Sequence, residues 1–394
     1  MKKKTVRDVA VRGKKVLVRV DFNVPLNADR RITDDKRIRE SLPTIRYLLE
    51  EKARVILISH LGRPKGKVVD DLRLDPMAKR LSELLGKAVK KLDESMGDSV
   101  RTAVEDMADG DVIILENIRF YPQEEKNEKE FAQKLSELGD LFVLDAFGTA
   151  HRAHASTVGL AAYLPAVAGL LMEKEITVLG RALENPAQPF VAIIGGAKVS
   201  DKIAVLDNLL EIADTLLIGG GMANTFLKAK GYSVGTSLLE EDKVDTAGML
   251  LKKAESLGKR LLLPVDVVIA EQMKEAASVR TVKAESIPDG WMALDIGDET
   301  RRIFAEYILQ AQTVIWNGPM GVFEMEPFSE GTRQITAAVA GCAGTTIVGG
   351  GDSAAAVEKF GRADDITHIS TGGGASLEFM EGKVLPGVAA LSDH

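Results

Sequence analysis

The chain has a single cysteine, Cys342, among its 394 residues, so it forms no internal disulfide and suits a reducing compartment. Its longest apolar runs, such as Val55–Ser59 and Val112–Leu115, have the length of strands and are too short to cross a bilayer. The N-terminus is basic, but no apolar stretch follows it, which argues against a secretory signal. We therefore expect a cytoplasmic protein that has no membrane segment.

Clustered metal ligands and an excess of positive charge are also missing from the sequence. No group of cysteine and histidine residues has the spacing of a zinc site. The formal net charge is −7, whereas nucleic-acid-binding proteins usually have a basic balance. We expect no nucleic-acid partner, although a locally basic site is compatible with an acidic chain.

Short β-branched runs alternate with amphipathic stretches along nearly the whole chain. This alternation predicts open parallel sheets with helices on both faces, and the chain length favours two domains. The fold class we predict is α/β, with two doubly wound, mostly parallel-sheet domains joined by a long helix and a hinge. The predicted strands are Val16–Phe22, Val55–His60, Val112–Phe120, Leu141–Phe147, Phe190–Gly195, Thr215–Gly219, Arg260–Val265, Thr313–Trp316, Thr345–Val348 and His368–Ser370. The predicted helices include Asp34–Lys52, Pro76–Leu85, Glu128–Leu138, Val199–Ile212, Asp242–Leu257 and Glu299–Gln310.

The composition changes near the middle of the chain. Leu170–Glu184 forms one long helical pattern, which Asn185, Pro186 and a new strand follow. Strand ends before this helix carry cations and carboxylates, whereas strand ends after it carry glycines. We therefore predict domains at 1–169 and 186–380, an inter-domain helix at 170–185, and a tail at 381–394 that packs back on the fold.

Charged and polar side chains follow four consecutive predicted strands in the N-terminal half. Ligands bind beyond the carboxyl ends of parallel strands, and arginine forks match carboxylate and phosphate in a bidentate way. Any one of these residues could be an ordinary surface side chain, but four strand ends together favour a site for a small phosphorylated acid. The candidates are Asp21, Asn23, Arg37, His60, Arg63, Arg119 and Arg152. Asp21 and Asn23 could also be turn residues, and a structural role explains His154 equally well.

A glycine-rich segment with two lysines opens the C-terminal half. Gly195, Gly196 and Ala197 follow a predicted strand, and a helix N-terminus after such a segment favours phosphate binding. Lys198 and Lys202 are four residues apart, so on a helix they share a face. Two neighbouring ammonium groups predict an anion between them; the alternative is a solvated basic face.

Three further glycine triplets follow predicted strands, at Gly219–Gly221, Gly349–Gly351 and Gly372–Gly374. Together they predict backbone nests for phosphates, with Gly220 in the first. Asp352 is a candidate Mg²⁺ ligand beside Ser353, because Mg²⁺ prefers carboxylate and phosphate oxygens. Glu324 lies in a loop where it could hold ribose hydroxyls.

Other nucleotide-binding signatures fit less well. Gly349–Ala354 matches the dinucleotide fingerprint, but no acidic residue ends the next strand to hold a ribose. The chain has no P-loop and no catalytic loop of the protein-kinase type. A nicotinamide-dependent dehydrogenase and a non-catalytic nucleotide-binding module remain the competing classes.

Taken together, the motifs resemble the phosphoglycerate kinase family. The segments VRVDFNVPL, SHLGRPKGK, LENIRFYP, DAFGTAHRAHAS, IIGGAKVSDK, WNGPMGVFE, GGGDSAAA and STGGGASLEF occur in that family's order, from Val18 to Phe379. One departure is Leu144, since many members have Asn immediately before the aspartate that matches Asp145. On a strand the side chain at 144 points away from Asp145, so we expect a change in packing there.

The resemblance implies an enzyme of glycolysis that moves a phosphoryl group reversibly between 1,3-bisphosphoglycerate and ADP, or between ATP and 3-phosphoglycerate. It implies an N-terminal domain for 3-phosphoglycerate, to which the tail at 381–394 returns, and a C-terminal domain for Mg²⁺ with ATP or ADP. It further implies a monomer, in-line transfer without a phosphoenzyme, and closure about a hinge. The residues that match the nucleotide site are Gly196, Ala197, Lys202, Gly220, Glu324, Gly350, Gly351, Asp352 and Ser353, with Asp352 toward the metal. The residues that match those near the transferring phosphoryl are Arg37, Lys198, Gly372, Gly373 and Gly374.

Overall fold

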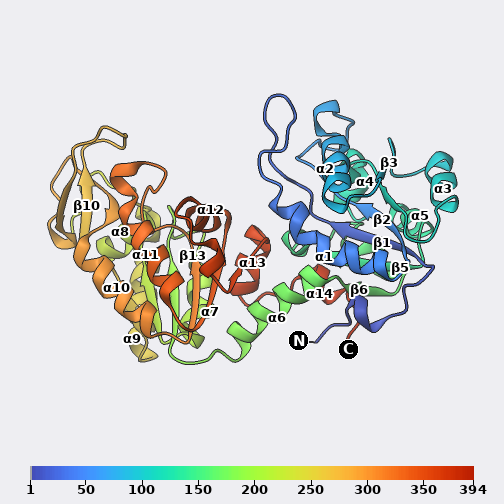
Figure 1. The fold of residues 1–394 in the computed structure, drawn as a ribbon. Helices are drawn as coiled ribbons and strands as arrows, with labels where there is room; N and C mark the ends of the chain where they lie inside the picture. Colours follow the sequence, from blue (N-terminus) through green and yellow to red (C-terminus); the bar gives the residue numbers. More distant parts are fainter. Residues whose placement is uncertain (1) are drawn as a thin grey trace. The chain divides into compact units, whose positions relative to one another are not determined.

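The computed structural model describes residues 2–394 (Figure 1). Their contacts divide them into two units, residues 2–177 with 384–394 and residues 178–383, and the boundary falls inside helix α6 (Leu170–Glu184). Each unit contains one six-stranded sheet in which neighbouring strands run parallel. The predicted α/β fold with two mostly parallel sheets is confirmed.

The sheet of the first unit has the strand order β3-β4-β2-β1-β5-β6. Its strands are β1 (Lys15–Val20), β2 (Arg54–Ile58), β3 (Lys90–Lys91), β4 (Val112–Ile114), β5 (Leu141–Asp145) and β6 (Ala166–Ala168). Its helices are α1 (Lys36–Glu50), α2 (Asp75–Leu85), α3 (Asp98–Glu105), α4 (Pro122–Glu125), α5 (Lys129–Ser136) and α14 (Pro386–Ala389). The chain proceeds from β1 to β2 on one side, whereas β5 pairs with β1 on the other. The order therefore reverses between β1 and β5, and open α/β sheets bind ligands at the carboxyl end of such a switch point.

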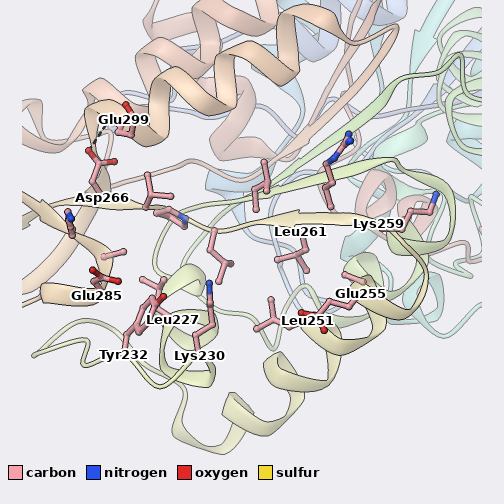
Figure 2. Close-up of a pocket in the computed structure, with 18 residues that line it drawn as sticks. Leu227, Lys230, Tyr232, Leu251, Glu255, Lys259, Leu261, Asp266, Glu285 and Glu299 are labelled. Atoms are coloured by element: carbon pink, nitrogen blue, oxygen red, sulfur yellow. Dashed lines mark hydrogen bonds between the residues drawn. The ribbon is translucent and has the colours of Figure 1, made fainter.

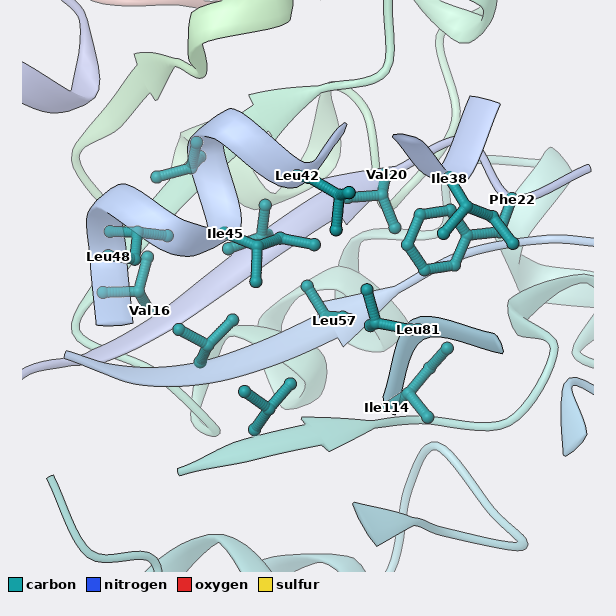
Figure 3. Packing of buried hydrophobic residues seen from close by; sticks show 14 of the residues in the cluster. Val16, Val20, Phe22, Ile38, Leu42, Ile45, Leu48, Leu57, Leu81 and Ile114 are labelled. Carbon is teal, nitrogen blue, oxygen red and sulfur yellow. The ribbon is translucent and has the colours of Figure 1, made fainter. Parts of the chain in front are cut away.

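An apolar core between α1 and the sheet holds the first unit together (Figure 3). Val16 and Val20 of β1 are fully buried, as expected for a central parallel strand. Helix α1 places Ile38 and Ile45 at helical spacing against them, and both side chains are fully buried. Burying each such side chain contributes roughly 1.5–3 kcal/mol to folding stability. Helix α1 therefore packs firmly on the strands whose ends carry the candidate residues.

The last residues of the chain pack on the first unit. Gly387 of α14 donates its N–H to the carbonyl of Ala150 at 2.8 Å, and Ser392 donates to the carbonyl of Ala166 at 2.9 Å. A Cβ added to Gly387 would lie 3.1 Å from Cδ2 of Leu144, which is fully buried. Leu144 therefore supplies an apolar contact beneath α14.

The sheet of the second unit has the strand order β15-β14-β13-β7-β8-β9. Its strands are β7 (Phe190–Ile194), β8 (Thr215–Ile218), β9 (Arg260–Leu262), β13 (Thr313–Asn317), β14 (Thr345–Gly349) and β15 (His368–Ile369). Its helices are α7 (Ile203–Ile212), α8 (Met222–Ala229), α9 (Val244–Ser256), α10 (Asp298–Gln310), α11 (Glu330–Gly341), α12 (Gly351–Lys359) and α13 (Gly373–Met380). Helices α10 and α11 contact each other and α7 contacts α13. Strand order reverses between β7 and β13, which places a second switch point at their carboxyl ends.

A small antiparallel sheet in the second unit was not predicted. It has the order β11-β10-β12, with β10 (Asp266–Ala270), β11 (Arg280–Lys283) and β12 (Met292–Ile296). The predicted strand Arg260–Val265 ends at Leu262, because Pro264 has no N–H for a strand ladder. The predicted strand Val112–Phe120 was also too long. It ends at Ile114, and Ile118–Phe120 forms a 3₁₀ helix (η3) capped by the side chain of Asn117.

Within residues 2–394, no helix combines the length and the apolar character needed to span a membrane.

Asp145, the last residue of β5, caps the first turn of α6. Its Oδ1 accepts from the backbone N–H groups of Leu171 at 3.0 Å and Met172 at 3.2 Å. The side chain is fully buried, and Oδ2 has no hydrogen-bond partner. Burial raises the pKa of Asp145 to about 6, and the bonds from Thr44, Met172 and Leu171 oppose that rise only in part.

Because the pKa of Asp145 is raised in the folded state, its contribution to stability is present at low pH and is lost as pH rises through about 6. Relative to the Asp145→Asn variant, the free energy of unfolding of the wild type should fall by about 3 kcal/mol between about pH 4 and pH 7. Urea unfolding followed by circular dichroism across this range measures the difference. The exposed residue Asp98 supplies the control variant, Asp98→Asn. A difference between wild type and Asp145→Asn that does not change with pH would contradict the prediction.

Candidate active site

Basic side chains from four segments gather near the carboxyl edge of the first sheet. Arg37 comes from α1, His60 follows β2, Arg119 lies in η3, and Arg152 follows a short 3₁₀ helix after β5. Burial, and then the charges of Arg19, Arg119, Arg152 and Arg37, lower the pKa of His60 well below its usual value. The structure thus brings these four predicted residues together, with Arg19 in addition. We call the five residues the cation cluster.

Asp21 and Asn23 hold parts of the cation cluster in place. Asp21 is 8% exposed, and its Oδ2 accepts from Nη1 of Arg37 at 2.8 Å. Asn23 Oδ1 accepts from the backbone N–H of Gly62 at 2.9 Å, which fixes the loop that follows His60. Arg63 is exposed in that same loop.

Arg119 is the most unusual member of the cluster. It is 4% exposed, its Nη1 donates to the carbonyl of Gly62 at 2.9 Å, and its Nε lies 3.5 Å from Glu125. Its Nη2 is buried without a hydrogen-bond partner. Burial, with the charges of Arg19 and Arg152, lowers the pKa of Arg119 to about 10, which leaves it charged at neutral pH. A buried charged donor without a partner is costly, so this geometry favours an anion at the cluster.

His154 is 9% exposed, and its Nδ1 lies 4.0 Å from the buried carboxylate of Glu124. Burial lowers the pKa of His154 to about 4, so it is neutral and adds no charge to the cluster. Sequence reasoning missed both Arg19 and Glu124. Arg19 had a detectable signal, because it is the only charged residue in the apolar run Val16–Val20. Glu124 had none.

In the second unit, the loops after β7, β8 and β13 lie backbone against backbone. Gly195 donates its N–H to Asn317 at 2.9 Å, Gly220 donates to Met320 at 2.9 Å, and Met222 donates to Gly196 at 3.0 Å. We call residues 195–198, 219–221 and 317–320 the glycine platform. It lies at the switch point between β7 and β13.

Close packing explains several of these glycines. A Cβ added to Gly195 would lie 2.2 Å from the carbonyl oxygen of Pro319, and one added to Gly220 would lie 2.6 Å from that of Gly196. Gly220 also has a φ of +69°, which favours glycine. The glycines at 219–221 were predicted as a phosphate nest, but close packing is a sufficient reason for two of them: a Cβ on Gly220 would meet neighbouring backbone, and one on Gly219 would lie 2.4 Å from Sδ of Met320.

The glycines that open α12 and α13 have no such explanation. A Cβ added to Gly351 or Gly373 would meet nothing within 4 Å, and neither residue has a positive φ. Gly350, the N-cap of α12, has a φ of +93° and so requires glycine. Gly372 is the N-cap of α13 and Gly374 is exposed. The space over both helix N-termini is therefore open to a ligand, and free N–H groups there suit phosphate.

The predicted relation between Lys198 and Lys202 is wrong. Helix α7 begins only at Ile203, with Lys202 as its N-cap, so the two lysines do not share a helix face. Lys198 is exposed in the preceding loop, whereas Nζ of Lys202 donates to Oδ1 of Asn317. Burial lowers the pKa of Lys202, while Asp201, Asp352 and Glu381 act in the opposite direction. Lys198 is therefore in contact with solvent, whereas Lys202 is partly buried and hydrogen-bonded.

The remaining predicted residues of the second unit lie on α12 and in the loops after β7 and β13. Ser353 is fully buried, and its Oγ accepts from the N–H of Gly318 at 2.6 Å, which joins α12 to the glycine platform. Asp352, in the first turn of α12, acts electrostatically on Lys202 and is exposed. Ala197 and Glu324 are exposed in the loops after β7 and β13. Residues 2–394 contain no group of three or more carboxylate, histidine or cysteine ligands, so a metal beside Asp352 would need oxygens from a ligand.

A separate cavity of about 860 Å³ lies beside β9, the last strand of this sheet (Figure 2). Its walls include Leu227 of α8, Leu251 of α9, Leu261 of β9 and the charged side chains of Lys230 and Glu285. None of the residues predicted from the sequence lines it. Its charges are of both signs, so it lacks the character of an anion site.

The family model of phosphoglycerate kinase matches residues 6–383. The chain belongs to the phosphoglycerate kinase family. It is 61% identical over 393 residues to the phosphoglycerate kinase of Pelotomaculum thermopropionicum and 60% identical over 393 residues to that of Moorella thermoacetica, with 100% of each chain covered. Membership of the phosphoglycerate kinase family makes the chain a glycolytic phosphotransferase with a carboxyl group as acceptor, as predicted.

Solved phosphoglycerate kinases share its fold. The structure of phosphoglycerate kinase from Coxiella burnetii matches with a TM-score of 0.91 and 44% identity, covering 98% of each chain. The crystal structure from Pyrococcus horikoshii matches with a TM-score of 0.85 and 36% identity, again over 98% of each chain.

The glycine platform predicts a specific effect of the Gly220→Ala substitution. Its Cβ would collide with backbone, and overpacking of this kind costs ~1–3 kcal/mol, so the platform must shift. We expect the Kd for Mg-ADP, measured by calorimetry, to rise by about tenfold or more. Gly231→Ala is the matched control, because Gly231 also has a positive φ, of +88°, but nothing lies within 4 Å of an added Cβ. Equal affinities in the two variants would contradict a contribution of the platform to nucleotide binding.

Proposed function

We propose that the protein catalyses reversible transfer of a phosphoryl group between 1,3-bisphosphoglycerate and ADP, or between ATP and 3-phosphoglycerate, through the residues described above. The observation that carries the assignment of the acidic substrate is the buried guanidinium of Arg119, whose Nη2 has no hydrogen-bond partner. A phosphate or carboxylate would satisfy this donor and neutralise the cations around it. The residues proposed to bind this substrate are Asp21, Asn23, Arg37, His60, Arg63, Arg119 and Arg152.

For the nucleotide, we propose the glycine platform and the open N-terminus of α12. The proposed residues are Gly196, Ala197, Lys202, Gly220, Glu324, Gly350, Gly351, Asp352 and Ser353. The exposed carboxylate of Asp352 fits Mg²⁺, which usually takes one or two protein carboxylates together with phosphate oxygens. When bound there, Mg²⁺ would neutralise charge on the phosphates.

The proposed mechanism needs no general base, because the attacking carboxylate of 3-phosphoglycerate is already ionised at neutral pH. The protein must align the reactants and neutralise charge in an in-line transfer without a phosphoenzyme. We propose that Lys198 and Arg37 contact the transferring phosphoryl, together with the N–H groups of Gly372, Gly373 and Gly374. Lys198 is exposed and lies on a loop. Its side chain can therefore move with the phosphoryl group as that group passes from one substrate to the other.

We assign acidic-substrate binding to residues 1–169 and nucleotide binding to residues 186–380, with the helix at 170–185 as the inter-domain segment and 381–394 as the returning tail. Direct transfer then requires hinge-bending closure, which also excludes water that would hydrolyse the acyl phosphate. We further propose a cytoplasmic monomer.

ADP formation from Mg-ATP, with and without 3-phosphoglycerate, tests the proposed reaction. Hydroxylamine added to the assay traps the acyl phosphate, which is less stable than ATP. We expect ADP and the trapped hydroxamate to appear in equal amounts, and only when both 3-phosphoglycerate and Mg²⁺ are present. ADP release without 3-phosphoglycerate, or with other small acids at equal rates, would overturn the substrate assignment.

The role of Lys198 makes a separate prediction. If the ammonium acts mainly in the transition state, Lys198→Ala should lower kcat by about a hundredfold or more and change both KM values little. Lys252→Ala is the control, because Lys252 is an exposed lysine of α9 outside both candidate sites. Steady-state kinetics in both directions measure the effect. A rise in the KM for ATP with unchanged kcat would assign Lys198 to ground-state binding instead.

A further inference from the structure

Arg19 lies at the base of the cation cluster and is fully buried in β1. A guanidinium in the interior loses its hydration and needs both a counter-charge and hydrogen-bond acceptors for its donors. A neighbour that accepts a hydrogen bond from Arg19 must have an unprotonated acceptor atom, so Arg19 constrains the protonation state of that neighbour.

The contacts of Arg19 form a chain through the interior of the first unit. Its Nε donates to Oγ of Ser156 at 2.8 Å, its Nη1 donates to the carbonyl of Val20, and its Nη2 lies 3.0 Å from Nδ1 of His60. Ser156 in turn donates from Oγ to Glu124 at 2.5 Å and from its N–H at 2.9 Å. Glu124 is fully buried, so it supplies the counter-charge of Arg19 through the hydroxyl of Ser156. The guanidinium is therefore held in place from two sides.

The contact with Arg19 decides the state of the His60 ring. A guanidinium has no acceptor and keeps its protons, so Nη2 can only donate. Nδ1 of His60 must therefore accept, which places the ring hydrogen on Nε2. A second proton on His60 would set two donors against each other at 3.0 Å. The contact is compatible only with a neutral imidazole.

We propose that Arg19 is a positioning residue that fixes His60 as the neutral Nε2–H tautomer, so that His60 offers the acidic substrate a hydrogen bond rather than a charge. The substrate part of this inference rests on the proposed function. The tautomer is a property of the protein without substrate and can be tested independently.

The surroundings of His60 reinforce the neutral state. The charged groups that act on it are Arg19 from β1, Arg37 from α1, Arg119 from η3 and Arg152 from the segment after β5, and all four are cations. His60 is 3% exposed, so little water reaches it to stabilise a charged ring. The sequence predicts His60 as a binding residue without fixing its charge; here it is the uncharged member of the cluster.

Nitrogen NMR of the full-length protein tests the tautomer directly. The chain has five histidines, and the His60→Gln variant identifies the His60 signals in long-range ¹H–¹⁵N spectra. We expect Nδ1 to show the shift of an unprotonated ring nitrogen and Nε2 that of a protonated one, unchanged between about pH 5.5 and pH 8. An Nδ1–H tautomer, or titration of His60 near its usual pKa, would overturn the proposal.

Removing the guanidinium tests the role of Arg19. In Arg19→Met, His60 should populate both tautomers and begin to titrate within the same pH range. Arg54→Met is the matched control, because Arg54 begins the neighbouring strand β2 but pairs with Asp109 outside the cluster. An unchanged His60 spectrum in folded Arg19→Met would overturn the role of Arg19. If that variant fails to fold, Arg19→Gln replaces it, because the glutamine amide is uncharged and ends at the position of Nε without an Nη2, and the same two outcomes apply to it.

Two substitutions at His60 test what the substrate receives. Glutamine places an amide N–H near the position of Nε2, whereas asparagine places its amide near Nδ1. We expect the KM for 3-phosphoglycerate to rise roughly tenfold less in His60→Gln than in His60→Asn, with kcat affected less than KM. Equal losses in both variants would overturn the donor role of Nε2. If wild type shows no turnover of 3-phosphoglycerate, the proposed function fails, while the NMR result still decides the tautomer.

Discussion

Burying a guanidinium in the central strand of the first sheet constrains everything around it. Arg19 has a single fully buried carboxylate within its network, Glu124, which it reaches through Ser156. That network ties β1 to α4 and to the segment after β5. Glu124 balances only one cation. The buried Arg119 lies 3.5 Å from the half-exposed Glu125 and is also acted on by the positive charges of Arg19 and Arg152, so the cluster keeps an excess of positive charge. The resulting positive potential is the physical basis of an anion site in an acidic protein.

The candidate site of the second unit is built from backbone groups rather than from buried cations. Its glycine platform brings three loops into backbone contact, and this packing leaves the N-termini of α12 and α13 uncovered at Gly351 and Gly373. Backbone N–H groups there need no counter-charge when no ligand is bound, unlike buried arginines. The proposed nucleotide would arrive with Mg²⁺ that neutralises part of its charge, so helix dipoles and one lysine would suffice to hold it. The proposed small acid would bring no counter-ion, which fits a cluster of cations in the first unit.

Patterns in the sequence predicted those features that depend on periodicity and on strand ends. The apolar runs of β1, β2, β7 and β13 located both sheets, and the polar residues after them located both edges. The exact ends of strands and helices were not predictable in this way. The strand predicted to continue to Phe120 ends at Ile114 because the side chain of Asn117 caps a 3₁₀ turn. Lys198 and Lys202 were placed on one helix because spacing alone does not reveal that α7 begins at Ile203.

Arg19 shows how such contacts can be anticipated. A charged residue in a strand that is otherwise apolar has no solvent to reach, since both faces of a central parallel strand are covered. Its side chain must find acceptors inside, and the carboxyl edge of the sheet is where polar groups are available. The residues it finds there, His60 and Ser156, come from segments far apart in the chain. Their identity follows from the fold rather than from local sequence. A buried arginine in such a strand is therefore a sequence signal for a polar network at a functional edge, and Asp145, at the end of the adjacent strand, follows the same logic by capping α6.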